Sequence, residues 1–543
     1  MPHCFKLARR LARLRSVLVR PSPSARTLPL RPQLPLATFL LVVGIIGCSQ
    51  DEQLTTGPEA TIENPDSTAA DSTTDSTTVI VTDSVGDGID SSLAAANTGT
   101  TIYPGQSIQA KVSAYPGGTT FTLKAGIHRQ QSIAPKSGNI FIGEPGTVLS
   151  GARLLTAFTR QGGYWVASGQ TQQGERRGVG NCDPASPRCP YPEQLFVNNV
   201  LLKHVSSLGA VGAGRWYFDY TADKIYFIDD PTGKKVETSV TPRAFDSYAS
   251  NVTIRGLTIE KYANSAGRGA IGYVAAGPGW VIEDNVIRGN FGVGIKTNTG
   301  MRARNNKILS QGHMGISGSG DDVLVEGNEI AWNNTAGFTM GWEAGATKFT
   351  RTNRLIVRGN FSHHNHGPGL WTDIDNINTL YENNRVEDND WRGIFHEISY
   401  KATIRNNICR RNGLKLPTGR PISPADGAGI LISNSPNVEI YGNTLEGNKN
   451  GIMGLETNRS PGKYGVTDIK YLYVHNNTIT QPTGRAAGLV QNIGSNAIYT
   501  SQNNRYAQNA YDIGTGTRYK WMNADLTVAQ WRAYGQDVTG SFQ

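Results

Sequence analysis

The chain has 543 residues, including 52 Lys and Arg and 43 Asp and Glu, and its formal net charge is +9 at pH 7. Gly is abundant at 63 residues and only 17% of the residues are charged, which favours a turn-rich, all-β exported protein over a helical cytosolic enzyme. No cluster of Lys and Arg interleaved with aromatic residues is present, so nucleic acid is not an expected partner.

Residues 1–47 predict an export signal. They carry eight Lys or Arg and no acidic residue, and they end in the apolar run LATFLLVVGIIG, which is short for a membrane span. Cys48 follows directly, and Ile45-Ile46-Gly47-Cys48 resembles the lipobox of bacterial lipoproteins. That resemblance implies a lipoprotein signal peptide, lipidation of Cys48, and a body exported to the periplasm or surface but anchored to a membrane of the bacterial cell envelope. An ordinary secretory signal with an incidental Cys is the alternative.

Residues 48–99 predict a disordered tether rich in Ser, Thr and Asp. Residues 48–96 hold ten acidic residues and no Lys or Arg, and they contain too few large apolar side chains to offset chain entropy. Residues 97–543 therefore hold 44 basic and 33 acidic residues, a net charge of +11. This excess mildly favours an anionic carbohydrate as partner, although surface charge that only maintains solubility is an equal alternative.

Residues 100–154 predict the first coils of a solenoid, because short alternating strands are separated by Gly and Pro turns. The phrases YPGGTTFTLKAGIHR and GTVLSG resemble the opening coils of secreted right-handed parallel β-helix proteins. Residues 155–242 break the pattern, and GRWYFDYTADKIYFIDDPTGKKVE predicts hairpins of an inserted antiparallel β subdomain. Cys182 and Cys189 flank a Pro-rich loop within it, and export would allow them to form a disulfide.

Residues 243–520 predict an all-β, single-stranded parallel β-helix, because two markers share one repeat and no helical period is present. An Asn recurs after short strands, with shortest spacings of 21 to 24 residues, at 285, 306, 328, 360, 384, 407, 443, 477 and 504. A Gly followed by an apolar residue recurs at 294, 315, 337, 369, 393, 429 and 451. We expect an internal Asn ladder, loops inserted at about 343–353, 413–425 and 456–468, and a helical C-terminal cap over 521–543.

The Gly marker aligns two acidic residues. The fourth residue after each marker Gly is, in order, Asn298, Ser319, Gly341, Asp373, Glu397, Ser433 and Leu455. The residue directly after each Gly is apolar and faces inward, so the second and fourth residues face outward. Asp373 and Glu397 should therefore lie on adjacent coils, with backbones about 4.8 Å apart. Such carboxylates repel, which raises one pKa and leaves the other group ionised, as acid and nucleophile require; a solvated acidic pair is the alternative.

Other side chains near this pair are candidates for substrate binding. Asp375 is a second acidic residue that competes with Asp373 as partner of Glu397. His366 precedes a Gly and is expected near the cleft, whereas His396 has inward parity and is expected to be structural. The aromatic residues expected either to stack on sugar rings or to cover the sheet are Trp371, Phe395, Trp342, Trp391 and Tyr400. The cluster of His363, His364 and His366 is not expected to hold a metal.

The stretch WTDIDNINTLYENNRVEDNDWRGIFHEIS resembles parallel β-helix glycoside hydrolases, notably the β-helix β-xylosidase family. The resemblance rests on its Trp-x-Asp-x-Asp and Gly-x-Phe-x-Glu pieces, and that family also carries an early inserted β subdomain. It implies that Asp373 or Asp375 is the nucleophile and Glu397 the acid/base. The resulting expectation is a monomeric, retaining glycoside hydrolase that acts on a polysaccharide or oligosaccharide without metal or cofactor.

Two other functions remain open from the residues. A polysaccharide lyase or uronate epimerase would abstract a proton, with Asp373 and Glu397 as cation ligands. Its base would be Tyr400, Lys401 or Lys296. A non-catalytic glycan-binding solenoid would use only the aromatic residues. The pieces GVGIKTN, GHMGISGSG and GDD are similar to parts of the polygalacturonase signature, but they occur in the reverse of the order found in that family. They leave Lys296 and His313 as minor candidates.

Overall fold

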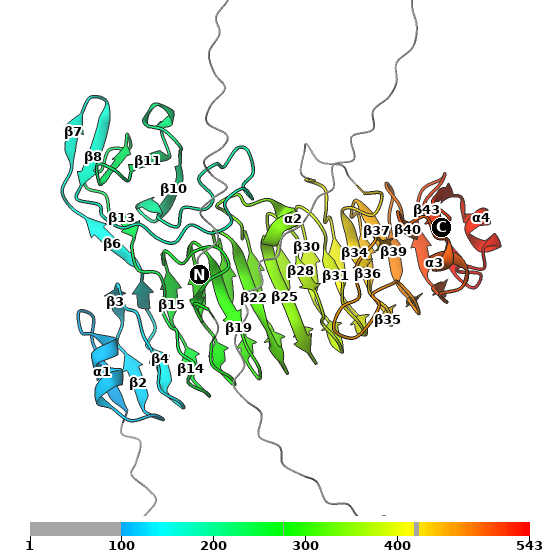
Figure 1. Ribbon diagram of the computed structural model, residues 1–543, viewed down its shortest axis with the longest axis horizontal. Coiled ribbons are helices and arrows are strands. Elements are labelled where there is room, and N and C mark those ends of the chain that lie inside the picture. Colours follow the sequence, from blue (N-terminus) through cyan, green and yellow to red (C-terminus); the bar gives the residue numbers. More distant parts are fainter. Residues whose placement is uncertain (1–98, 275, 417–422) are drawn as a thin grey trace, which may run out of the picture. The chain divides into compact units, whose positions relative to one another are not determined.

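The computed structural model describes residues 99–543 except residues 275 and 417–422, so Cys48, the predicted signal and nearly all of the predicted tether lie outside the described residues. The described chain forms a parallel β-helix in which coil after coil adds short strands to three long sheets, with an inserted β subdomain (Figure 1). The predicted all-β fold class is therefore confirmed. None of the helices among these described residues is long and apolar enough to cross a membrane.

The first sheet has 13 parallel strands. Its strands are β1 (Thr100–Ile102), β2 (Thr120–Leu123), β4 (Ile140–Gly143), β14 (Thr253–Arg255), β17 (Val281–Glu283), β20 (Arg302–Arg304), β23 (Leu324–Glu326), β26 (Ile356–Arg358), β29 (Thr379–Glu382), β32 (Ala402–Arg405), β35 (Val438–Tyr441), β38 (Tyr473–His475) and β41 (Arg505–Ala507).

The second sheet also has 13 strands. They are β3 (Gly126–Arg129), β5 (Thr147–Ser150), β15 (Thr258–Glu260), β18 (Val286–Arg288), β21 (Lys307–Leu309), β24 (Glu329–Ala331), β27 (Phe361–His363), β30 (Arg385–Glu387), β33 (Ile408–Arg410), β36 (Thr444–Glu446), β39 (Thr478–Thr480), β42 (Ala510–Asp512) and β45 (Ser541–Phe542).

The third sheet has 11 strands and carries the predicted acidic pair. Its strands are β16 (Gly269–Ile271), β19 (Val293–Thr297), β22 (Met314–Asp321), β25 (Gly345–Asn353), β28 (Leu370–Asp373), β31 (Ile394–Glu397), β34 (Ala428–Ser433), β37 (Asn450–Glu456), β40 (Ala487–Gln491), β43 (Tyr519–Trp521) and β44 (Ala524–Leu526). All pairs in it are parallel except the last, β43 with β44.

Two buried ladders of amide side chains run along the coils. In the first, each Asn donates from its backbone N and its Nδ2 to the Oδ1 of the Asn one coil on, for example Asn285 to Asn306 at 3.1 and 3.0 Å. The residue before each of these Asn has positive φ, and apart from Gln508 it is Asp, Asn or Gly, the types that tolerate that conformation best. A second ladder, which the sequence did not predict, consists of Asn290, Gln311, Asn333, Asn365, Asn389, Asn412 and Asn448.

The first ladder ends differently from the prediction. Asn477 donates to Asn509, and Asn509 donates to Asp537 near the C-terminus. Asn504 is therefore not a ladder member; its Nδ2 donates instead to the carbonyls of Ile469 and Ile498. The last coil is covered by α4 (Val528–Ala533), whose Trp531 is fully buried, and the other helices are α1 (Ile108–Ala114), α2 (Met340–Glu343) and α3 (Ala497–Thr500).

One coil has a different register from the one predicted. Gly337 and Phe338 are not part of a strand; residues 332–344, which include α2, form the insertion, and the strand is β25. The predicted loop at 343–353 is therefore wrong for most of its length. Because Phe349 of β25 pairs with Thr372 of β28, the outward neighbour of Trp371 is Lys348 rather than a residue near Gly341.

The inserted subdomain is an eight-stranded sheet. In spatial order its strands are β6 (Ala152–Leu155), β13 (Val236–Ser239), β9 (Leu195–Val197), β10 (Val200–His204), β11 (Arg215–Asp219), β12 (Lys224–Phe227), β8 (Tyr164–Ser168) and β7 (Thr159–Gln161), with a 3₁₀ turn at Leu208–Ala210. It is mixed rather than wholly antiparallel, because β10 and β11 pair in parallel. Buried Glu237 ties it to the solenoid through ion pairs with Lys261 (2.5 Å) and Arg129 (2.7 Å).

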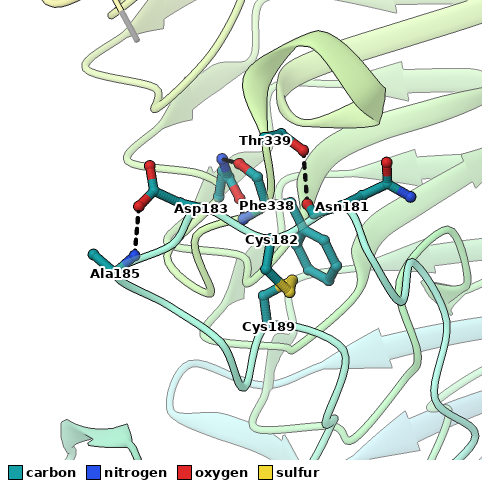
Figure 2. The surroundings of a disulfide bond; sticks show 8 residues. Asn181, Cys182, Asp183, Ala185, Cys189, Phe338 and Thr339 are labelled. Carbon is teal, nitrogen blue, oxygen red and sulfur yellow. Dashed lines mark hydrogen bonds between the residues drawn. A yellow bond between two sulfur atoms is a disulfide. The ribbon is translucent and has the colours of Figure 1, made fainter. Parts of the chain in front are cut away.

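A disulfide joins Cys182 to Cys189 and closes a short loop of the subdomain (Figure 2). Cys182 bridges to Phe338 in antiparallel fashion, and Thr339 N donates to Asn181 O at 2.8 Å. The loop thereby holds the segment just before α2, the helix that carries Trp342 and Glu343. Cys409, in β33 of the solenoid, is the remaining cysteine of the described residues, and it is free and buried.

We expect the double change Cys182→Ser and Cys189→Ser to lower the free energy of unfolding by roughly 2–3 kcal/mol, because a short closed loop is lost from the unfolded ensemble. Urea denaturation followed by circular dichroism measures this difference. The wild-type chain in reductant should have the same free energy of unfolding as the double variant. Cys409→Ala in reductant is the control that shows whether the free thiol contributes to the effect of the reductant. Equal stability of oxidised and reduced wild-type protein would contradict the prediction.

Candidate active site

Asp373 and Glu397 lie at the ends of adjacent strands of the third sheet. Asp373 pairs directly with Glu397. The two preceding pairs along these strands are Trp371–Phe395 and then Thr372–His396. Thr372 and His396 are fully buried and hydrogen-bond to each other inside the coil, so the two carboxylates project from the opposite, outward side. The register and orientation predicted from the Gly marker are therefore present.

Asp373 is held by a lysine that the sequence analysis did not single out. Its Oδ2 lies 2.9 Å from Lys348 Nζ, and its Oδ1 is buried without a hydrogen-bond partner among the described residues. Lys348 also lies 3.4 Å from Glu343 Oε1 and 4.3 Å from the centroid of the Trp371 ring. Burial lowers the pKa of the Lys348 ammonium, but the charges of Asp373 and Glu343 outweigh burial, so its pKa is raised. Lys348 therefore stays charged beside Asp373.

Glu397 has the opposite electrostatic environment. Only 14% of its side chain is exposed, and its Oε1 lies 3.4 Å from Nη2 of Arg459. Burial, and after it the charge of Asp373, raises the pKa of Glu397 to about 7, although Arg392, Arg459 and Lys348 oppose the rise. The two carboxyl groups thus differ, because one is held by a cation while the other retains a proton up to neutral pH.

Asp375 does not share this arrangement. Its backbone is left-handed, with φ of 59°, and its Oδ1 accepts a 2.7 Å hydrogen bond from the backbone N of Lys463. The carboxylate therefore anchors the loop between β37 and β38. Asp373 is the residue paired with Glu397 across the strands, so the geometry favours Asp373 as its working partner.

Trp371 and Phe395 are outward but not exposed. Their rings stack at 5.3 Å and are only 2% and 1% exposed, because they lie in an apolar cluster that covers this face. The other buried members of the cluster are Ala425, Ala428, Leu431, Met453 and Val490. Of the two roles predicted for this pair of aromatic residues, the structure therefore supports covering of the sheet, and it corrects the expectation of an open stacking surface.

The remaining candidates hold the surrounding loops. Trp391 is buried and its Nε1 donates to Asp426, and Tyr400 is buried and donates from its hydroxyl to Gly465 O at 2.7 Å. Trp342 is partly buried against Phe338 and His313. His366 has a half-exposed side chain whose Nδ1 lies 2.7 Å from Asp390 Oδ2. Among these residues only His366 has a side chain that is about half exposed.

A cavity of about 150 Å³ lies beside Lys348 on the same face of the sheet. Its polar lining consists of Lys296, Ser317, Ser319, Glu343, Lys348 and Thr350. Lys296 pairs with Ser317, and Ser317 pairs with Lys348. The cavity therefore lies over β19, β22 and β25, the three strands that precede the strand of Asp373. Burial lowers the pKa of Lys296, whose Nζ donates to Ser317 Oγ at 3.3 Å. The site therefore offers cations, a carboxylate and hydroxyl groups to a polar ligand.

The histidines show no arrangement typical of a metal centre. Within the part of the chain that the structure describes, no group of three or more His, Cys, Asp or Glu is placed to hold a metal ion. His396 is fully buried, with a pKa lowered to about 4 chiefly by burial, and its Nε2 lies 2.7 Å from Tyr400 O. His313 is likewise buried, with a pKa lowered to about 3 chiefly by burial. Both have the surroundings of structural histidines.

Comparison with known proteins agrees with the fold. Residues 269–420 match the model of the right-handed beta helix region. The structure of XylC in complex with xylose has a TM-score of 0.53 and 15% identity, over 75% of this chain and 80% of that chain. The A-module of mannuronan C-5 epimerase AlgE4 from Azotobacter vinelandii has a TM-score of 0.40 and 12% identity, over 80% and 92%. No curated protein matches the sequence. The chain is thus a right-handed parallel β-helix protein whose fold is similar to that of XylC.

Proposed function

We propose that this protein is a glycoside hydrolase that cleaves a polysaccharide or oligosaccharide with retention of anomeric configuration. The observation that carries the proposal is the in-register pair of Asp373 and Glu397 with opposite electrostatic surroundings. Adjacent parallel strands lie about 4.8 Å apart, which agrees with the roughly 5–5.5 Å between the two carboxyl groups of retaining enzymes.

The chemistry follows from the surroundings of each group. Asp373 attacks the anomeric carbon as the nucleophile, and Lys348 Nζ holds its Oδ2 at 2.9 Å. Glu397 donates its proton to the glycosidic oxygen as the bond to the leaving group breaks. Glu397 then takes a proton from water, the hydroxide adds to the anomeric carbon, and the ester to Asp373 breaks, which restores both carboxyl groups.

A glycan panel tests the proposal on the full chain. Release of reducing ends is followed together with absorbance of unsaturated products, and xylosides come first because XylC was solved with xylose. The stereochemistry of the first product, read by NMR, should show retention. Cleavage with inversion would remove the basis of the proposal. Cleavage that neither Asp373→Asn nor Glu397→Gln affects would do the same.

A lyase or epimerase is the second candidate, and one observation favours it. Burial lowers the pKa of Lys296 inside the cavity next to Lys348, as a general base requires. A lyase would form one unsaturated end for each new reducing end, whereas an epimerase would invert a uronate carbon without cleavage. Either activity, if it is lost in Lys296→Met, would establish this alternative. Tyr400 is a weaker base candidate, since its hydroxyl already donates to Gly465 O.

Lys348→Met tests the positioning of Asp373. Lys348 lowers the pKa of Glu397, so its removal should move the alkaline limb of the pH–rate profile to higher pH. It should also reduce kcat by about tenfold or more, since Asp373 and Glu343 lose their cation. A purely structural lysine would change stability without moving the pH profile, and Lys307→Met, on the second sheet, is the matched control.

We also propose that Cys48 carries a lipid that holds the body at a membrane of the cell envelope. The proposal rests on the lipobox-like sequence before Cys48, which lies outside the described residues. Cys48→Ser should shift the protein from the membrane fraction to the soluble exported fraction after detergent-free fractionation. Persistence of the Ser variant in the membrane fraction would show that another segment is responsible.

A further inference from the structure

A second cavity, of about 250 Å³, lies between the inserted subdomain and the solenoid. It shares no lining residue with the cavity beside Lys348. The subdomain contributes β10 and β11 and the disulfide-closed loop, while the solenoid contributes Phe291, Thr335 and Ala336. The cavity is therefore bounded by segments far apart in sequence, and nothing in the proposed hydrolysis uses it.

One wall of this cavity is aromatic. The His204 ring stacks on Trp216 with centroids 4.2 Å apart and an interplanar angle of 20°. Tyr191 meets His204 edge-on at 5.7 Å, and Trp216 is fully buried. Flat, rigid aromatic surfaces of this kind favour ligands with an apolar face, and they lose little entropy on binding.

The same wall carries polar atoms that the protein leaves without partners. Both ring nitrogens of His204, Nε1 of Trp216 and Nε of Arg188 are buried and have no hydrogen-bond partner among the described residues. Each such group carries a substantial desolvation penalty, so native proteins rarely leave several of them together. Their concentration in the lining of one cavity indicates that the missing partners belong to a ligand.

The wall of this cavity combines a neutral imidazole with charged side chains. Burial, followed by the charges of Arg188 and Arg176, lowers the pKa of His204 far below its usual value, so the imidazole is neutral and offers one donor and one acceptor. The guanidinium of Arg176 lies 4.1 Å from the Tyr191 centroid, and that of Arg188 lies 4.3 Å from it. Glu193 also lines the cavity and accepts a 2.7 Å hydrogen bond from Tyr220. Arg188 and Lys203 also line the cavity, so its cations outnumber its one carboxylate. The neutral imidazole of His204 needs both a donor and an acceptor, which favours a ligand with hydroxyl groups over a simple anion.

We propose that this cavity binds one neutral sugar residue, and that the inserted subdomain is thus a second carbohydrate-binding site. Sugar hydroxyls supply acceptors for the indole and guanidinium N–H groups and either partner for the imidazole, while the C–H face packs on aromatic rings. The volume of about 250 Å³ is large enough for a single sugar ring. The proposal does not depend on hydrolysis at Asp373 and Glu397.

Calorimetric titration tests it on the full chain carrying Glu397→Gln, which slows turnover of methyl glycosides. The probes are the methyl β-glycosides of xylose, glucose and galactose. We expect one glycoside to bind with an affinity that His204→Phe and Trp216→Phe each reduce by about tenfold or more, because each change removes hydrogen-bonding groups but keeps an aromatic ring. Trp165→Phe, in the same subdomain but outside the cavity lining, should leave that affinity unchanged.

Crystals of the unsubstituted protein, soaked with a selenium-containing methyl glycoside of the bound sugar, provide a readout that needs no folded variant. An anomalous peak inside the cavity is expected. A cavity that holds only water in the soaked crystals overturns the proposal, as does glycoside binding that both substitutions leave unchanged. Sulfate that competes with the glycoside for this site would also overturn it, because the site would then be anionic in preference.

Discussion

Glu397→Gln is expected to reduce kcat/KM by about 10²–10⁴-fold on glycosides with poor leaving groups, because the buried proton donor is lost. On aryl glycosides with strongly acidic phenols the loss should be much smaller, since such a leaving group departs without protonation. Asp373→Asn should remove turnover of both substrate classes, because it deletes the nucleophile itself. The comparison of the two leaving-group series is measured by initial rates at pH 6.

Two neighbouring changes sharpen this experiment. Ser433→Ala alters the residue paired with Glu397 on the next strand and should leave turnover nearly unchanged. Asp375→Asn should weaken the hydrogen bond to Lys463 and alter KM, while kcat on a small aryl glycoside is kept. If Asp375→Asn removes turnover and Asp373→Asn does not, the assignment of the nucleophile is wrong.

Glu397 is also expected to make the fold less stable as the pH rises. Its folded-state pKa of about 7 lies above the usual value of 4.5 for Glu, so the folded state binds more protons than the unfolded state between these pH values. The free energy of unfolding is therefore highest below about pH 4.5 and falls as the pH rises to about 7. The total loss attributable to this group is roughly 3 kcal/mol.

Urea denaturation of wild type and Glu397→Gln, at pH 4.5 and at pH 8, isolates this contribution. The Gln variant cannot ionise, so its stability should fall by roughly 3 kcal/mol less than that of wild type over this interval. Asp512→Asn, a change at an exposed carboxyl group, serves as the control. If the free energies of unfolding of wild type and Glu397→Gln change equally with pH, folding does not raise the pKa of Glu397. That result would weaken the assignment of Glu397 as the acid.

The local pattern of the sequence was sufficient for the solenoid and for the acidic pair. Asn preceded by Asp, Asn or Gly encodes a left-handed residue followed by a ladder amide, and this motif recurs coil by coil. The Gly marker aligned Asp373 with Glu397 because both residues belong to adjacent coils of nearly the same length, with no insertion between their strands. Periodicity of this kind is a property of short segments, so it can be read without knowledge of distant contacts.

Lys348 was missed for the opposite reason. The insertion at 332–344 displaces the strand of its coil from the Gly marker, and only the backbone pairing of Phe349 with Thr372 places Lys348 beside Asp373. Without this register the sequence could pair the two acids but could not say which one a cation holds.

The repeat, the parallel sheets and the outward register of Asp373 and Glu397 thus follow from the local sequence, because they depend on the alternation of side chains along each strand. The accessibility of the side chains, in contrast, depends on how distant segments pack. Trp371 and Phe395 have the parity of a binding surface but are covered by residues far along the chain, such as Ala425 and Val490. The cavity at His204 likewise exists only because the insertion folds back on the solenoid, since burial and unpaired polar atoms depend on non-local packing that no repeat encodes.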